Sequence, residues 1–535
     1  MPVRLRDFLY TPRGAPRLVP VGLVAFVASL VLVLLAFRAF PSSKTETELA
    51  HTLIAAGKAA EAEAMYARLV REKPTVPRVL ALIQAHKLAR GASARFRHKK
   101  DHDDHALTPS AAMSEEELGT LVASLPPDVS VFARAALGDG AAREELEEGA
   151  AREPPLPWAN HVLALDAEDA GESEKAANLL LREGLAFPER REDLQSAVVL
   201  WIDLDAWDEV HEKLDDPRIA AAVDATTRYE IAIHDRDWRT ASRALPSMWR
   251  LRLEPRYLAL AGIAALAWAF FCARLGKAKE RAALRFTLYL AAFALGVASV
   301  VPTFLLITIE EAKLRLVETG DLGRDTLFFV FGVGLREEAS KLLLFLPLLP
   351  ILRRWGDKLD VLVCGAMVGL GFAAQENLGY LASEDLHTGL GRFLTANFLH
   401  MAMTALLANA LDDFARDSEK HASDFLRTSL LVVGLHGAYD LLLTREDPAA
   451  SYAAMAVFVI LTKLFLDAVD LARKKVDRGL SPSHAFIVAL AVVTGTSLAH
   501  AIDIVGLQQA PLVLAQGLLG EAIIIIVFVR ILGAM

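Results

Sequence analysis

The chain has 535 residues, of which 54% are hydrophobic, and its mean hydropathy is +0.34. Its formal net charge is −9 and it carries no basic stripe with interleaved aromatic residues, which argues against a nucleic-acid partner. The apolar residues lie mostly in long blocks after Arg256, a pattern that predicts a polytopic membrane protein rather than a series of soluble domains.

The N-terminal segment predicts a membrane anchor. Residues 1–17 contain four arginines and are followed by an apolar run over 18–40. That run is long enough to cross about 30 Å of hydrocarbon, and it exceeds the apolar core of a signal peptide. We therefore expect an uncleaved transmembrane signal anchor, with the basic residues 1–17 in the cytoplasm.

Residues 41–255 have the composition of a soluble helical domain, rich in Ala, Glu, Leu and Arg. Two segments of it share one spacing, because Gly57, Ala62, Tyr66 and Pro74 match Gly171, Ala176, Leu180 and Pro188 position for position. The spacing resembles the tetratricopeptide helix-turn-helix repeat, and an ordinary helical bundle is the alternative. Because stacked repeats form concave binding surfaces, we expect this domain to dock membrane-protein substrates.

Residues 256–535 are expected to form a polytopic membrane domain. Its apolar spans lie near 256–274, 282–309, 326–352, 359–383, 391–412, 425–444, 449–472, 484–506 and 512–533. With the anchor, these make about ten transmembrane helices. The predicted fold class is therefore all-α, a transmembrane helix bundle plus an extramembrane α-helical repeat-like domain.

The loops between these spans predict the orientation of the chain. Basic residues gather in alternate loops, which contain Arg274, Lys277, Lys279, Arg281, Arg285, Arg353, Arg354, Lys358, Arg416, Lys420, Arg427, Arg473, Lys474, Lys475 and Arg478. By the positive-inside rule, these loops and both termini are cytoplasmic. We expect a multi-pass protein of the cell (inner) membrane, with residues 41–255 periplasmic or extracellular.

Four consecutive spans carry ionisable residues within their apolar sequence. They are Glu337, Glu338 and Lys341 in the first, Glu376 in the second, His400 in the third, and His436 and Asp440 in the fourth. A charged residue at the centre of a membrane helix costs at least about 2.5–3.5 kcal/mol, so such residues usually have a function. At 1.5 Å of rise per residue, Glu337, Glu376, His400 and His436 lie roughly 10–17 Å from the outer ends of their helices. One shared site at about 326–444 is the prediction.

Two pairs within this set have helical spacing. Glu337 and Lys341 are four residues apart, as are His436 and Asp440, so each pair shares one helix face. Alone, each pair fits a structural ion pair or a hydrogen bond between helices. The joint occurrence of five ionisable groups at one depth favours a functional site instead.

The order of these motifs resembles the PrsW family of bacterial intramembrane proteases, which are related to the CAAX prenyl-protease and bacteriocin-processing superfamily. The motifs are Glu-Glu-x-x-Lys, Gly-Phe-x-x-x-Glu-Asn-x-x-Tyr, a single His, and His-x-x-x-Asp, over roughly 329–443. The stretch 359–380 is the most specific part. The resemblance does not extend to residues 41–255.

The resemblance implies roles for the ionisable residues in peptide hydrolysis. Glu337 or Glu338 would activate a water molecule as general base, and His400 would bind that water or protonate the leaving amine. His436 would stabilise the oxyanion. Such an enzyme would cleave membrane-anchored proteins, for example an anti-sigma factor or a signalling protein.

Other positions of the motifs complete the predicted site. Glu376 is counted among the catalytic residues, although it stands where the wider superfamily often has histidine. Asp440 stands where relatives often have asparagine, so the division of labour is open. Lys341, Asn377, Tyr380 and Asp440 are expected to support the catalytic residues.

The metal content of the site has two interpretations. Glu337, Glu376, His400 and His436 could hold zinc with one open position. The His-Glu-x-x-His helix of soluble metalloproteases is absent from the sequence. We therefore predict no cofactor and glutamate-type hydrolysis, with zinc as the less favoured alternative.

Two functions other than proteolysis remain open. A proton- or ion-coupled transporter would use further ionisable residues near the membrane, namely Lys463, Asp467, His500, Asp503 and Glu521. No pair of broken helices or inverted repeat is evident in the sequence, which argues against this function. The second alternative is a catalytically silent membrane scaffold.

Overall fold

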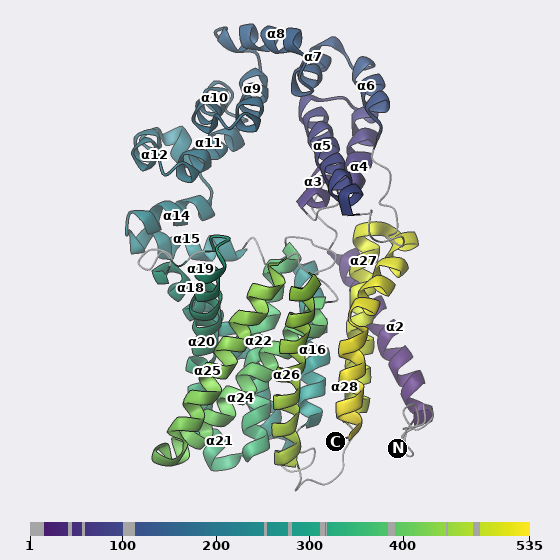
Figure 1. Cartoon of the computed structure of the whole chain (residues 1–535), viewed down its shortest axis with the longest axis vertical. Helices are drawn as coiled ribbons and strands as arrows, with labels where there is room; N and C mark the ends of the chain where they lie inside the picture. The colour runs from purple at the N-terminus through teal and green to yellow at the C-terminus, as the bar shows by residue number, and fades with distance from the viewer. Residues whose placement is uncertain are drawn as a thin grey trace. The chain divides into compact units, whose positions relative to one another are not determined.

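The structure is a computed structural model that describes residues 15–40, 45–55, 59–99, 113–250, 254–275, 281–310, 316, 318–382, 391–445, 448–473 and 482–534 (Figure 1). Every regular element in these ranges is a helix, so the predicted all-α fold is confirmed. The chain divides into two compact units, here called the membrane unit (Met1–Pro41 and Arg252–Met535) and the outer unit (Ser42–Leu251).

The outer unit is a succession of short helices. They are α3 (Glu46–Ala55), α4 (Ala59–Glu72), α5 (Val76–Lys99), α6 (Glu115–Ala123), α7 (Pro127–Ala136), α8 (Gly140–Ala151), α9 (Ala159–Asp169), α10 (Ser173–Ala186), α11 (Arg191–Asp203), α12 (Trp207–Leu214), α13 (Pro217–Ala222), α14 (Ala225–His234) and α15 (Trp238–Arg250). Helices adjacent in sequence pack together, as α10 does with α9 and α11, and α14 does with α15. The assignment of these helices to tetratricopeptide repeats stays a prediction.

Polar caps explain where several of these helices begin. Asp224 accepts a hydrogen bond from the Thr227 backbone N–H at the start of α14, and Asp216 accepts one from Arg218 N–H at the start of α13. Each cap satisfies a backbone donor that has no partner within the helix. Between these capped helices the chain turns sharply, so that α14 follows α12 after one six-residue helix.

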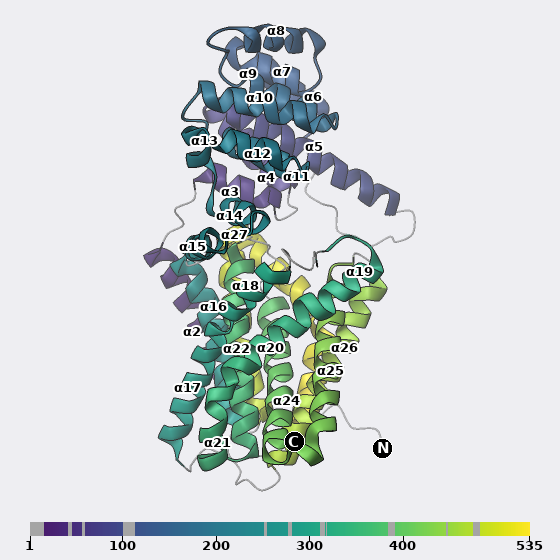
Figure 2. The same cartoon turned by 90° about the vertical axis from the view of Figure 1, so that its left-hand side faces the viewer.

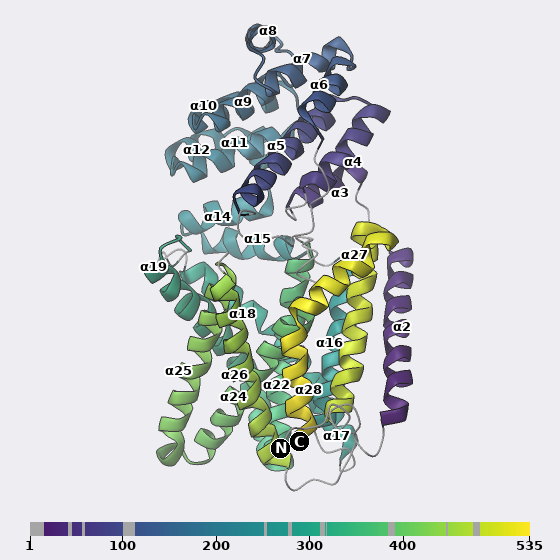
Figure 3. The ribbon, with the colours of Figure 1, turned by 45° about the vertical axis from the view of Figure 1, so that its right-hand side comes forward.

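The membrane unit contains longer helices. They are α2 (Ala15–Ala39), α16 (Pro255–Leu275), α17 (Ala282–Ala298), α18 (Val300–Ile309), α19 (Leu322–Leu327), the π-helix η2 (Phe328–Leu335), α20 (Arg336–Phe345), the 3₁₀ turn η3 (Leu346–Leu348), α21 (Leu349–Trp355), α22 (Lys358–Ala382), the π-helix η4 (Arg392–Ala396), α24 (Asn397–Arg416), α25 (Ser418–Leu443), α26 (Pro448–Arg473), α27 (Pro482–Gly520) and α28 (Ala522–Ala534). Figure 3 shows α2 beside α27, against which it packs.

Within the described ranges, eight helices are long and apolar enough to cross a membrane. A ninth span is counted if the pair 506–519 and 522–532, bent by 58°, forms one span. The segment expected as a span over 326–352 is helical throughout, as an uninterrupted succession of π-, α- and 3₁₀-helical stretches from η2 to α21. Pro347 and Pro350 lack the backbone N–H that a continuous α-helix needs, and they lie in η3 and at the start of α21. The π-helix η2 is of a kind that often marks functional sites.

Helix α22 lies at the centre of the membrane unit and is buried over residues 359–374. It packs against α16, α17, α20 and α24, and Figure 2 shows it beside α17 and α20. Glycine makes this close approach possible, because a Cβ at Gly369 would overlap the carbonyl group of His400 on α24. The same close approach of α22 and α24 brings Glu376 and His400, one on each helix, within contact distance.

Candidate active site

Helix α20 brings three charged residues into the interior of the membrane unit. Glu337, Glu338 and Lys341 are all buried, and Lys341 is completely so. The Lys341 ammonium donates hydrogen bonds to Glu338 Oε1 at 2.7 Å and to Glu337 Oε2 at 3.3 Å. Spacings of three and four residues on one helix place both carboxylates beside the same cation, which offsets part of their cost of burial.

His400 links this group to α22. Its Nδ1 lies 2.9 Å from Lys341 Nζ and its Nε2 lies 3.0 Å from Glu376 Oε2. Since an ammonium group only donates, Nδ1 must accept, which leaves the proton on Nε2 to be donated to Glu376. Thus the neighbours of His400 determine its tautomer, and its ring connects one carboxylate on α22 to the cation on α20.

His436, on α25, extends the group in the other direction. Its Nδ1 lies 3.2 Å from Glu338 Oε1, and its Nε2 lies 3.3 Å from Asp440 Oδ2 and 3.8 Å from Glu337 Oε2. The His436 and His400 rings meet edge to face with their centroids 5.3 Å apart. These contacts make one continuous chain of polar side chains across four helices, here called the polar chain. Its members are Glu376, His400, Lys341, Glu337, Glu338, His436 and Asp440.

The two ends of this chain are more accessible than its middle. The side chains of Glu376 and Asp440 are 24% and 28% exposed, whereas those of Lys341 and His436 are buried. Hydrolysis requires water to reach the buried residues, and these two carboxylates are where the chain meets the surface of its unit.

Two residues of the site were absent from the predicted set. Arg392, in η4, lies 2.8 Å from Glu376 Oε2 and donates to Asn377 Oδ1 at 3.0 Å. Thr404 donates to Glu338 Oε2 at 3.3 Å. Arg392 stands at the start of an expected span, where a basic residue is usual. From the sequence, only its nearness in the chain to the motif around Glu376 could have pointed to it.

The structure places the predicted site residues in two groups. Glu337, Glu338, Lys341, Glu376, His400, His436 and Asp440 join the polar chain directly. Asn377 and Tyr380 instead flank Arg392: Asn377 also donates to Asn397 Oδ1, and the Arg392 guanidinium lies 3.4 Å above the Tyr380 ring. These two residues therefore position Arg392 rather than the central carboxylates.

Three residues of the alternative transporter pathway form ion pairs of their own. Lys463 pairs with Asp467 on the exposed face of α26, at 2.6 Å. Asp503 forms an ion pair with Arg256.

The site contains a donor set that suits a transition metal. One ligand atom from each of Glu337, His400 and His436 lies within 4.8 Å of the others, and all three residues are buried. Two imidazole nitrogens and a carboxylate oxygen are ligands that zinc accepts. However, the Lys341 ammonium lies at hydrogen-bond distance from both Glu337 and His400 Nδ1, and a metal there would face a buried positive charge.

Comparison with known proteins identifies the same region of the chain. Residues 285–465 match a family model described as "PrsW family intramembrane metalloprotease". The membrane unit is similar to PrsW proteases. Every residue of the polar chain lies inside the matched range, whereas the outer unit, α2, α27 and α28 lie outside it.

Two curated relatives resemble part of this chain. Protease PrsW of Clostridioides difficile (strain 630) is 27% identical over 143 residues, which are 26% of this chain. Protease PrsW of Bacillus subtilis (strain 168) is 28% identical over 131 residues, or 24% of this chain. The alignments cover 60% of the length of each relative. No solved structure matches the chain.

Proposed function

We propose that this chain is an intramembrane endopeptidase of the PrsW type that cleaves membrane-anchored proteins. The observation that carries the proposal is the polar chain from Glu376 to Asp440, buried among apolar helices within the region similar to PrsW proteases. Charged groups are expensive in such surroundings, and a structural ion pair would need only two of them.

The contacts of the two adjacent glutamates suggest which of them is the general base. Glu338 is held by Lys341 at 2.7 Å and by Thr404 at 3.3 Å, with His436 also beside it. Glu337 has longer contacts, at 3.3 Å to Lys341 and 3.8 Å to His436. Glu337 is therefore the carboxylate with room to accept a hydrogen bond from water, and Glu338 orients Lys341 and His436.

Peptide hydrolysis at this site would follow from these positions. The Glu337 carboxylate takes a proton from water as the water oxygen adds to the carbonyl carbon of the substrate. His436, whose ring nitrogens lie 3.2 Å from Glu338 and 3.3 Å from Asp440, exchanges one of these long contacts for a hydrogen bond from its N–H to the developing oxyanion. The proton on Glu337 then passes to the leaving nitrogen as the C–N bond breaks.

A metal ion would change only how the water is activated. Zinc held by Glu337, His400 and His436 would act as a Lewis acid and supply hydroxide at neutral pH. We propose the metal-free form, because the Lys341 ammonium already engages Glu337 and His400 Nδ1. Glu376 and Arg392 then hold the His400 ring in place from the other side.

The proposal is tested by the membrane-protein fragments that accumulate in cells. Quantitative mass spectrometry would compare wild-type cells with cells expressing a Glu337→Gln, Glu338→Gln double variant. Glu521→Gln is the matched control, since it neutralises a carboxylate of the membrane unit outside the matched range. Fragments cut within a transmembrane segment should disappear only in the double variant; fragments that persist there would refute the proposal.

A further inference from the structure

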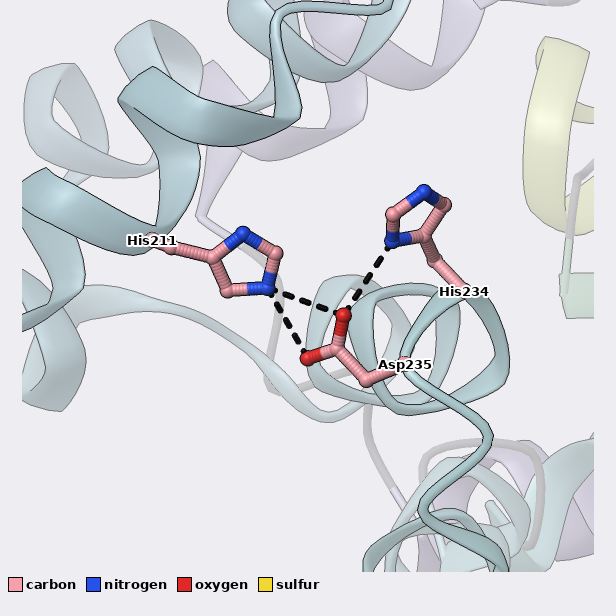
Figure 4. Close-up of side chains that lie close together, drawn as sticks. All are labelled: His211, His234 and Asp235. Carbon is pink, nitrogen blue, oxygen red and sulfur yellow. Dashed lines mark hydrogen bonds and ion pairs between the residues drawn. The ribbon is translucent and has the colours of Figure 1, made fainter.

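A second group of histidine and carboxylate side chains lies in the outer unit, outside the region that matches the family. His211 belongs to α12, His234 is the last residue of α14, and Asp235 follows it (Figure 4). Their potential ligand atoms all lie within 4.8 Å of one another, and all three side chains are exposed or nearly so.

The two imidazole rings converge on one carboxylate. His211 Nε2 lies 2.8 Å from Asp235 Oδ1 and 3.0 Å from Oδ2. His234 Nδ1 lies 3.1 Å from the same Oδ1. Figure 4 shows both rings with a nitrogen directed at Asp235, although His211 and His234 are separated by 23 residues of chain.

Trp207 orients both histidines. Its backbone carbonyl lies 2.6 Å from His211 Nδ1, and its indole ring stacks on the His234 ring with centroids 3.7 Å apart and planes 6° from parallel. The indole N–H in turn donates to Asp205 Oδ1 at 2.6 Å. Metal-binding histidines are commonly fixed in this way, with the second ring nitrogen donating to a backbone carbonyl.

The hydrogen bonds of His211 call for a positive charge beside Asp235. The Trp207 carbonyl can only accept, so His211 Nδ1 carries a proton and donates it. In the neutral ring, Nε2 then presents a lone pair to two carboxylate oxygens that also only accept. Either a second ring proton or a metal ion can stand between them, and a metal ion could take a nitrogen of His234 as a further ligand.

We propose that His211, His234 and Asp235 form a divalent transition-metal site, best suited to Zn²⁺. Two imidazole nitrogens and one carboxylate oxygen are a ligand set that zinc accepts, with water in the fourth position. Zinc bonds of roughly 2.0–2.1 Å place tetrahedral ligand atoms roughly 3.3 Å apart. The observed separations from Asp235 are a few tenths of an ångström shorter, a difference that rotation of the exposed Asp235 carboxylate accommodates while Trp207 holds the two rings.

The metal would tie α12 to α14 across the short helix α13. The outer unit has no cysteine, since Cys272 and Cys364 both lie in the membrane unit, so a disulfide cannot make this link. Because a ligand that binds only the folded state stabilises it, Zn²⁺ should raise the unfolding temperature of the outer unit.

The test uses the full-length protein in lipid nanodiscs. Glu337→Gln and His436→Gln are introduced first, so that the buried donors do not contribute. Titration with Zn²⁺, and with Co²⁺ followed by its visible absorption, should show one site per chain. His211→Gln should abolish it. His161→Gln is the matched control, because His161 also pairs with an aspartate, Asp193, at 2.9 Å and belongs to no such group among the described residues.

A replacement that keeps a ligand separates metal binding from structure. In the same background, His211→Cys should bind Cd²⁺ with the ultraviolet absorption of a thiolate–metal bond, and His161→Cys should not. Equal zinc binding by the parent and His211→Gln would overturn the proposal. So would no binding at micromolar zinc, which would mean that a second proton on His211 is what pairs with Asp235.

Discussion

Replacing Lys341 with methionine tests whether its ammonium is what allows two glutamates to be buried on α20. The change keeps the length of the side chain and removes the charge that lies 2.7 Å from Glu338 and 3.3 Å from Glu337. Removing one partner of a buried ion pair leaves the other uncompensated and costs about 3–5 kcal/mol. We expect Lys341→Met to destabilise the membrane unit by that amount.

Lys358→Met provides the matched control. Lys358, at the start of α22, pairs with Asp413 near the end of α24, but both side chains are more than one-third exposed. An exposed pair contributes about 0.2–1 kcal/mol, so this variant should unfold close to the wild type. Equilibrium unfolding in mixed micelles would measure both variants under the same conditions.

A second substitution checks the cause. Adding Glu338→Gln to Lys341→Met removes the carboxylate nearest the lost cation, so the double variant should be more stable than the sum of the two single losses predicts. A coupling of about 0.5–3 kcal/mol is expected for charges in contact. If Lys341→Met and Lys358→Met have equal free energies of unfolding, the buried ammonium does not compensate the glutamates and the reasoning fails.

Three further predictions concern packing, pH and metal. Gly369→Leu should abolish proteolysis, because a side chain there meets the His400 backbone. Gly262→Leu should not, because a side chain at Gly262 would point into open space. Equal proteolytic activity of the two variants would contradict the packing argument. Burial raises the pKa of Glu183 above 4.5, so its stabilising contribution to the outer unit is present below 4.5 and is lost as pH rises through the folded value. As the pH rises above 4.5, the unfolding temperature of the wild type should therefore fall relative to that of Glu183→Gln. A constant difference between the two unfolding temperatures at every pH would refute this prediction. Chelators should leave proteolysis by a His211→Gln variant intact, since Lys341 already engages the buried donors; loss of activity that zinc restores would show a metal enzyme.

The grouping of the polar chain followed from sequence because charged residues are rare in apolar spans. Glu337, Glu376, His400 and His436 stood out against leucine, alanine and valine, and helical rise placed them at a similar depth. The structure brings their side chains into one chain of contacts. Depth could be estimated in this way because it depends only on position along each helix, not on how the helices pack.

Features that depend on packing were not accessible in the same way. Arg392 lies at the start of an expected span, where a basic residue needs no partner, and only the fold shows its ion pair with Glu376. The changes of helix type within the expected span 326–352, to π-helical and 3₁₀ turns, are features that hydropathy does not report. His211 and His234 lie on separate helices, and the turns around α13 bring them to one carboxylate.

The central claim is that Glu337 activates water for cleavage of a peptide bond in the membrane. The most direct measurement is the rate at which the purified protein in nanodiscs cuts a single-pass membrane protein whose fragments depend on the wild-type enzyme in cells. Glu337→Gln should lower that rate about 10²–10⁴-fold, as expected for loss of a general base, while Glu521→Gln leaves it unchanged. A Glu337→Gln variant that cleaves at the wild-type rate would contradict the account.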